Sequence, residues 1–160
     1  MSKTTVIATP GVPQAIVTRE FDAPRDLVFR AWTEPELLRQ WLGPRKYQMT
    51  IERWDLRDGG SYRYTHSDDA GNVHAFHGVF HGDASPDQMV QTFEYEGYPG
   101  HVSFDTLTLE DRDGRTLVRT NSLFQSVEDR DGMIDNGMTE GMDEGFDRLD
   151  ELLAGMLARA

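Results

Sequence analysis

The feature that most constrains the fold is a series of short alternating segments between Tyr47 and Phe124, each ended by turn-forming residues. Glycine, proline and aspartate gather between them, at 58–60, 68–72, 85–87, 97–100 and 113–114. Apolar and polar residues alternate within the segments, as they do in strands whose two faces differ. Short strands that succeed one another every ~8–12 residues form an antiparallel meander. The pattern predicts six strands, at 47–56, 60–67, 73–83, 88–96, 102–110 and 115–124.

The preceding segment predicts one further strand and two short helices. Residues 14–21 alternate as a strand. Pro24 suits the first turn of a helix, where a missing N–H is tolerated, and the chain is largely apolar from there to Trp32. A second short helix should end at Gly43-Pro44, which cannot continue it.

The chain after Ser126 changes to helical spacing. Between 138 and 157 its apolar residues recur three or four positions apart, which predicts one long amphipathic helix. The apolar face consists of Met138, Met142, Phe146, Leu149, Leu152, Leu153, Met156 and Leu157. The opposite face carries Glu140, Asp143, Glu144, Asp147, Asp150 and Glu151, and we interpret these acids as a solvated surface.

These elements predict an α+β fold in which a curved, seven-stranded antiparallel sheet wraps around the long C-terminal helix. Met138, Met142, Phe146 and Leu149 should face the sheet, because an uncovered concave sheet would expose a large apolar surface to water. We expect one domain over 14–160, preceded by a loose N-terminal arm over 1–13.

Composition excludes several classes of function. The net charge is −12, from 28 acidic and 16 basic residues, which argues against binding to nucleic acids and to anionic membranes. The chain has no cysteine, so disulfides, thiolate catalysis and cysteine-ligated metals are excluded. It contains no apolar run of the ~18 residues that cross a bilayer and no secretory signal at its start, which predicts a cytoplasmic protein.

Several motifs in order resemble a known family. The segments TREFDAPRDLVFRAWTEPELLRQWLGP and WDLRDGGSYRY resemble the activator-of-heat-shock-protein-90-ATPase homologue (AHSA-like) family of the SRPBCC, or START-like, superfamily. The matching positions are Arg19, Phe21, Ala23, Pro24, Val28, Phe29, Ala31, Trp32, Thr33, Pro35, Trp41, Gly43, Pro44, Asp55, Arg57, Gly59 and Gly60. The C-terminal NGMTEGMDEGFDRLDELL is similar to the family's last helix, so the resemblance spans about residues 14–158. It implies a helix-grip fold, in which the sheet grips the last helix around a ligand cavity.

Aromatic and methionine side chains that could line such a cavity are abundant. The candidate ligand-binding residues are Trp41, Tyr64, His66, His77, Phe80, Phe93, Tyr95, Phe104, Met138, Met142 and Phe146. Bulky aromatic rings opposite flexible methionines are typical of an apolar small-molecule site, and equally of an ordinary core. The sequence does not separate these two roles.

We expect no metal and no cofactor. His77 and His81 share a strand face but lie ~13 Å apart, too far for one metal ion, and a cross-strand pair of His66 with His77 lacks a third ligand. The acids around Asp131 fail the calcium-loop pattern, since Met133 stands where an oxygen ligand is needed.

Glycines 137, 141 and 145 recur every four residues in the last helix, at a cost of ~1 kcal/mol each in helix propensity. Two explanations stay open. The glycines either allow a close approach to neighbouring backbone or leave open volume between helix and sheet.

Three functions follow, in this order. The first is binding or sequestration of a small hydrophobic or amphipathic molecule between the sheet and the last helix. The second is a cyclase- or hydrolase-like enzyme, with an acid–base group among Glu94, Asp105, His66, His77, Tyr64 and Tyr95. The third is a co-chaperone-like interaction with heat-shock protein 90, placed last because such proteins carry a further N-terminal domain that these 160 residues do not contain. A homodimer stays open as well.

Overall fold

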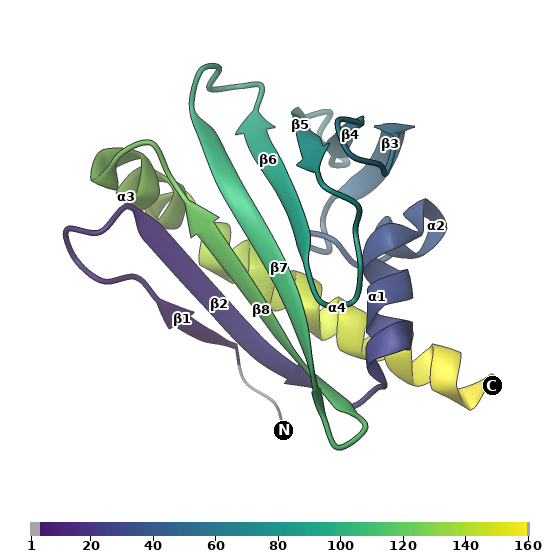
Figure 1. The fold of residues 1–160 in the computed structure, drawn as a ribbon. Coiled ribbons are helices and arrows are strands. Elements are labelled where there is room, and N and C mark those ends of the chain that lie inside the picture. The colour runs from purple at the N-terminus through teal and green to yellow at the C-terminus, as the bar shows by residue number, and fades with distance from the viewer. Residues whose placement is uncertain (1–3, 160) are drawn as a thin grey trace.

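The computed structural model describes residues 4–159, which form one eight-stranded antiparallel sheet and four helices (Figure 1). The strand order across the sheet is β1-β2-β8-β7-β6-β5-β4-β3. The strands are β1 (Thr5–Ile7), β2 (Gln14–Phe21), β3 (Gln48–Trp54), β4 (Ser61–Ser67), β5 (Val73–His81), β6 (Met89–Tyr95), β7 (Val102–Arg112) and β8 (Arg115–Leu123). The helices are α1 (Arg25–Thr33), α2 (Pro35–Leu38), α3 (Val127–Asp135) and α4 (Met138–Ala158). No helix of this part of the chain combines the length and the apolar character that a membrane span requires.

The predicted α+β helix-grip architecture is confirmed, with eight strands instead of seven. The additional strand is β1, which lies in the segment we expected to be a loose arm and pairs Val6 with Val17 of β2. Its three residues are too few to show an alternating pattern, and their pairing depends on a partner ten residues away. Arg130 of α3 secures the same segment, since its guanidinium donates to the carbonyls of Thr9 and Gln14.

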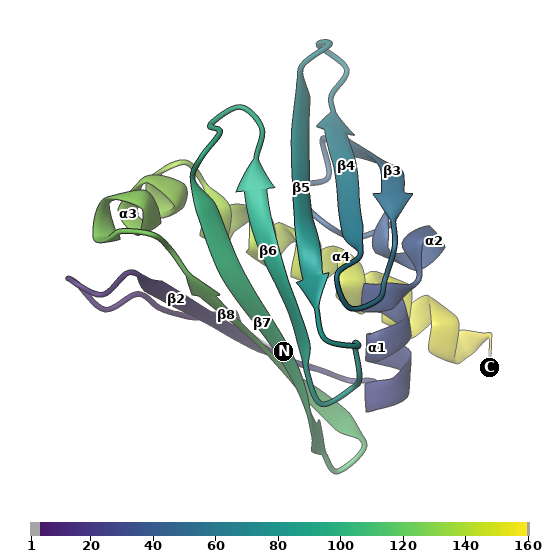
Figure 2. The ribbon, with the colours of Figure 1, turned by 45° about the horizontal axis from the view of Figure 1, so that its top comes forward.

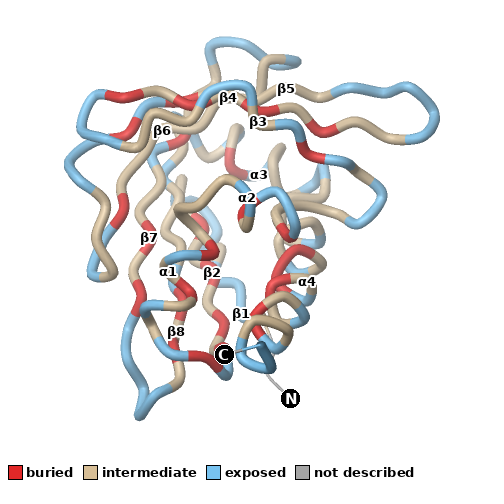
Figure 3. The backbone as a smooth tube through the Cα atoms, turned by 90° about the vertical axis from the view of Figure 1, so that its right-hand side faces the viewer, coloured by how far each residue is buried: buried red, intermediate tan, exposed pale blue. Residues whose placement is uncertain are grey.

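The sheet bends around α4, which crosses its concave side (Figures 2 and 3). The buried residues of α4 are Gly145, Phe146, Leu149 and Leu153, so the predicted inward placement of Phe146 and Leu149 is correct. Met138 and Met142 lie at the start of the same helix and are only half-buried. The helix therefore closes the sheet tightly along its second half and less completely along its first turns.

The acidic side of α4 is only partly a solvated surface, contrary to our interpretation. Arg19 on the inner face of β2 is 4% exposed and contacts three carboxylates of the helix. Its guanidinium lies 2.8 Å from Asp147 and 3.6 Å from Asp143, and it also binds Asp150. Burial lowers the pKa of Arg19, but the hydrogen bonds to Asp147 and Asp150 raise it by more. The acids are 39–56% exposed, so they lie along the flank of the helix and hold it against β2.

The glycines of α4 are explained by close contact with the loop that follows α2. A β-carbon at Gly145 would lie 3.1 Å from the carbonyl oxygen of Trp41 and from the amide nitrogen of Gly43. Gly141 is less crowded, with Pro44 at 3.7 Å, and Gly137 caps the helix in the left-handed region at φ 95°. The stripe thus lets the helix approach the α2 loop, and the alternative of an open volume beside it is not what these positions provide.

Candidate functional site

The strand register decides which side chains face α4. On β4 the inward residues are Tyr62, Tyr64 and His66, all buried between half-buried neighbours. Tyr64 pairs with Phe76 of β5, and Phe76 pairs with Tyr95 of β6, so these three rings share the concave face. The same alternation places Phe93 and Gln91 of β6 inward.

One half of the concave face is a sealed core next to α1. Trp41, Phe80 and Phe146 lie here and are 1–2% exposed. The indole N–H of Trp41 donates to the Ala31 carbonyl at 2.9 Å, and the Phe146 ring packs edge-on against Phe21, with 5.5 Å between ring centroids. These three candidates from the sequence therefore serve as core, and a ligand could not contact them without unpacking it.

The other half of the concave face, toward α3, keeps accessible surface. Phe76, Phe93 and Tyr95 point to the concave side and are nevertheless half-buried. Met138 and Met142 are half-buried on α4, at the end nearer to α3. Apolar side chains of two facing elements that both keep exposed surface mark the place where the sheet and the helix do not fill the space between them.

The aromatic rings of this half form a continuous row of near-parallel planes. The ring centroids of Tyr64 and Phe76 are 5.1 Å apart, and those of Phe76 and Phe93 are 5.4 Å apart, with interplanar angles of 26° and 24°. Tyr95 continues the row at 5.2 Å from Phe76, and its hydroxyl is 2.8 Å from Nδ1 of His74. The row offers an apolar wall about three strands wide.

A row of polar side chains crosses the concave face beside the aromatic wall. Gln91 lies opposite Asp105 of β7, and Asp105 lies opposite Ser122 of β8. The Asp105 carboxyl is within hydrogen-bonding reach of the hydroxyls of Ser103 and Ser122, while its Oδ1 is inaccessible and has no hydrogen-bond partner among the described residues. Burial raises the pKa of Asp105 to about 6, and the two serines offset only part of that rise.

Gln91 is held by a neighbouring tyrosine. Its side-chain amide donates to the Tyr62 hydroxyl at 3.1 Å, and this hydroxyl donates to the Thr92 carbonyl at 2.6 Å. Gly78 permits the arrangement, because a β-carbon there would lie 2.7 Å from the Tyr62 ring. Burial, together with the charges of Tyr64 and Asp105, raises the pKa of Tyr62 well above its usual value, so it remains a neutral phenol.

His66 marks the far end of the aromatic row. It is 6% exposed, its ring stacks on Tyr47 at 5.6 Å, and its Nε2 lacks a hydrogen-bond partner in the described structure. Burial, aided by the charge of Arg148, lowers the pKa of His66 to about 4, so the ring is neutral near pH 7. Its cross-strand partner is His74, so the expected pairing of His66 with His77 is wrong.

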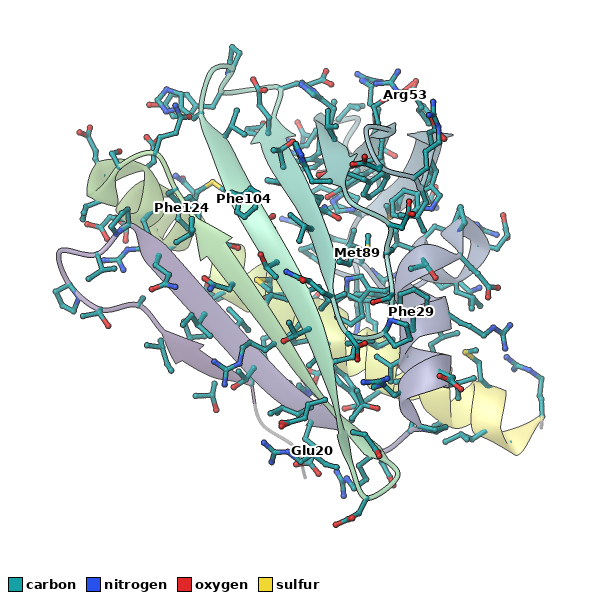
Figure 4. The ribbon with its side chains drawn as sticks, in the orientation of Figure 1. Glu20, Phe29, Arg53, Met89, Phe104 and Phe124 are labelled. Atoms are coloured by element: carbon teal, nitrogen blue, oxygen red, sulfur yellow. The ribbon has the colours of Figure 1, made fainter. Side chains whose placement is uncertain are left out.

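Two of the candidate ligand-binding residues lie on the opposite, convex face. His77 points outward and contacts Glu94 and Glu96. Phe104 is 43% exposed and pairs with Thr92 and Leu123, and Figure 4 shows it on the side of the sheet away from α4. Placing them in the cavity was wrong by one position of strand register, which moves a side chain to the other face.

Polar residues of the concave face were largely missed. Asp105 was one of several acid–base candidates, whereas Gln91, Ser122 and Thr120 were not considered. A signal did exist, because Asp105 has the same parity in its strand as Leu107 and Leu109, which are buried. A charged residue in phase with buried leucines is unusual enough to indicate a functional position.

Metal ligation and surface pockets add little to this site. No group of three or more His, Asp or Glu side chains within residues 4–159 is arranged to hold a metal ion. Two surface pockets of about 400 and 420 Å³ lie elsewhere, one beside Arg25 and Asp87 and the other between Arg148 and Gln40. Both are lined by charged side chains of both signs and contain none of the candidate ligand-binding residues.

Comparison with solved structures shows that this fold is shared with bacterial proteins. A protein of Rhodobacter sphaeroides is similar with a TM-score of 0.86 at 24% identity, covering 96% of this chain and 99% of that one. A protein of Arthrobacter aurescens gives 0.87 at 27% identity over 94% and 91% of the two chains. CalU16 of Micromonospora echinospora gives 0.64 at 21% identity over 99% and 90%. A comparison with curated protein sequences gave no significant match.

The family model described as "Activator of Hsp90 ATPase homolog 1-like protein" matches residues 22–154, which include α1, the meander and most of α4. The match agrees with the motifs around Pro24, Trp41 and Gly60 and with the helix-grip architecture. The chain belongs to the activator of Hsp90 ATPase homolog 1-like family of the SRPBCC superfamily.

Proposed function

We propose that this protein binds a small hydrophobic or amphipathic molecule between the concave face of the sheet and the first turns of α4. One observation carries the proposal. Phe76, Phe93 and Tyr95 face α4 and yet keep accessible surface, opposite Met138 and Met142, which do the same. Sealing the site with protein atoms alone would require larger side chains than those present.

The chemistry of this lining suits a flat apolar ligand. Near-parallel rings spaced 5.1–5.4 Å apart offer edges and faces to another ring system, and methionines adapt to irregular shapes. Removing ~200 Å² of apolar surface from water would contribute ~5 kcal/mol to such binding before the entropic costs of association.

The proposal is tested with N-phenyl-1-naphthylamine, an uncharged apolar dye whose fluorescence rises on leaving water. We expect the wild-type protein to bind it, Phe93→Ala to weaken binding about tenfold through lost apolar contact, and Phe104→Ala to leave it unchanged. Phe104 is the matched control, because it is an aromatic residue of the adjacent strand on the convex face. An equal loss in both variants, or no binding by the wild type, would contradict the proposal.

A second candidate function is favoured by one specific observation. The Asp105 carboxyl faces the concave side with its pKa raised to about 6, and a general base works best when its pKa is close to the operating pH. A cyclase- or hydrolase-like reaction would use it to take a proton from the bound molecule. Turnover of a molecule that co-purifies with the protein, followed by mass spectrometry and lost in Asp105→Asn, would support this function over simple binding. The heat-shock-protein-90 interaction rests on the family description alone.

A further inference from the structure

We infer that Asp105 and Thr120 form the polar end of the ligand site and select an apolar molecule that carries a hydroxyl or amino group. The inference rests on the proposed function and names the ligand class for the same site. Two unsatisfied polar atoms at one place in an otherwise apolar face carry it.

The register brings these two residues together. Asp105 pairs with Ser122, and Thr120 is the next inward residue along β8, where it pairs with Leu107. Diagonal neighbours on one face of an antiparallel pair lie within ~7–8 Å. Both Oδ1 of Asp105 and Oγ1 of Thr120 are buried and have no hydrogen-bond partner in residues 4–159.

Neighbouring groups do not satisfy these atoms. Gln91 lies directly opposite Asp105, but its amide nitrogen donates to the Tyr62 hydroxyl. The Tyr62 hydroxyl in turn donates to the Thr92 carbonyl. The hydroxyls of Ser103 and Ser122 reach the carboxyl and still leave Oδ1 free. A buried polar atom without a partner costs ~1–3 kcal/mol, so a group that satisfies it gains that much on binding.

The chemistry of the missing partner follows from the atoms that need it. A carboxylate oxygen accepts hydrogen bonds only, so the ligand group must be a donor, and a threonine hydroxyl can accept or donate. A hydroxyl or an amino group meets both conditions. A ligand carboxylate, sulfonate or phosphate would place like charge beside Asp105 and is selected against.

The apolar part of the ligand would extend toward the aromatic row. Phe93 is one inward position from Gln91 on β6 and therefore lies diagonally beside Asp105. The row continues from Phe93 to Phe76 and Tyr64. A donor group at one end of a ring system thus matches the order of polar and apolar surface along the concave face.

The test compares two probes that differ only in the donor. 2-Naphthol carries a hydroxyl, and 2-methoxynaphthalene has the same rings without a hydrogen to donate. Their dissociation constants are measured by calorimetry at pH ~8, where a carboxyl of this pKa is ionised. We expect the wild type to prefer 2-naphthol at least tenfold, as for a hydrogen bond to a charged acceptor.

Variants assign that preference to its residues. Asp105→Leu should abolish the preference while keeping affinity for 2-methoxynaphthalene, and Thr120→Val should reduce the preference by a few-fold. Thr106→Val is the control, because Thr106 is adjacent in β7 and points to the convex face. Circular dichroism confirms that each variant is folded.

The outcomes separate this inference from the proposed function. Equal binding of both probes by the wild type, or a preference that survives in Asp105→Leu, would overturn the polar subsite and leave apolar binding intact. Failure of the wild type to bind either probe, together with the apolar dye, would overturn both.

Discussion

The carboxyl of Asp105 should make the protein less stable at neutral pH than it would be without this charge. Its pKa is about 6 in the folded protein, against 3.8 for an ordinary aspartate, because burial penalises the ionised form. The folded state therefore holds the proton more tightly than the unfolded state does. Stability contributed by the protonated form is fully present below pH ~4 and is lost as the pH rises through about 6.

The magnitude follows from the difference in pKa. A shift of about two units corresponds to ~3 kcal/mol at ~1.4 kcal/mol per unit, and partial exposure of the residue makes this an upper bound. Asp105→Asn keeps the shape of the side chain and removes the charge. We expect the free energy of unfolding at pH 8 to rise by ~1–3 kcal/mol in this variant and to be nearly unchanged at pH 4.

Urea unfolding followed by tryptophan fluorescence at pH 4, 6 and 8 measures this effect. The control is Asp69→Asn, which removes the same charge from an exposed turn between β4 and β5, because the net charge of −12 alone could make charge removal stabilising. The difference between the two variants isolates burial. If Asp105→Asn lowers stability at pH 8, the carboxylate is a satisfied structural group and the argument for a free Oδ1 fails.

Other predictions test the packing around α4. Gly145→Ala should cost ~1–3 kcal/mol by urea unfolding, because its β-carbon would meet backbone atoms at 3.1 Å, whereas Gly141→Ala should stabilise by up to ~1 kcal/mol through helix propensity; equal effects would contradict the close contact. Phe146→Ala should cost ~3–5 kcal/mol, and a loss below ~1 kcal/mol would show that the site is not close-packed. His66 should make the protein acid-sensitive: its pKa is lowered from 6.5 to about 4, so its contribution is present above pH ~6.5 and lost as the pH falls toward 4, and His66→Gln should flatten that part of the profile.

Helical spacing carried more of this structure in the sequence than strand alternation did. Phe146 and Leu149 recur at an interval that only one face of a helix satisfies, so their burial could be predicted. In a strand, either of two faces can be the inner one, and an error of one residue exchanges them. His77 was placed with the wrong set for that reason. Phe104 was misplaced because an aromatic residue looks like core, whereas here it pairs with Leu123 on an exposed face.

Long-range pairing accounts for most of what the sequence did not reveal. Arg19 reads as an ordinary strand residue, and its three carboxylate partners lie more than 120 positions away on the flank of α4. The polar row depends on three strands in register, at Gln91, Asp105 and Ser122, and no local pattern relates those positions. Such pairings become visible only when the order of the strands in the sheet is known.

The polar row is also where this protein departs from the rule that governs the rest of its core. Near α1 every inward residue is apolar or has its hydrogen bonds satisfied, as with the Trp41 indole and the Thr116 hydroxyl that donates to Ala23. Toward α3, Asp105 and Thr120 retain buried polar atoms without partners, where leucine or valine would fold more stably. A cost to stability confined to the half of the face that also keeps accessible aromatic surface is typical of a binding site, since stability and recognition make opposite demands on the same side chains. The two halves of one concave face thus separate the residues that hold the fold from those that are free to recognise a ligand.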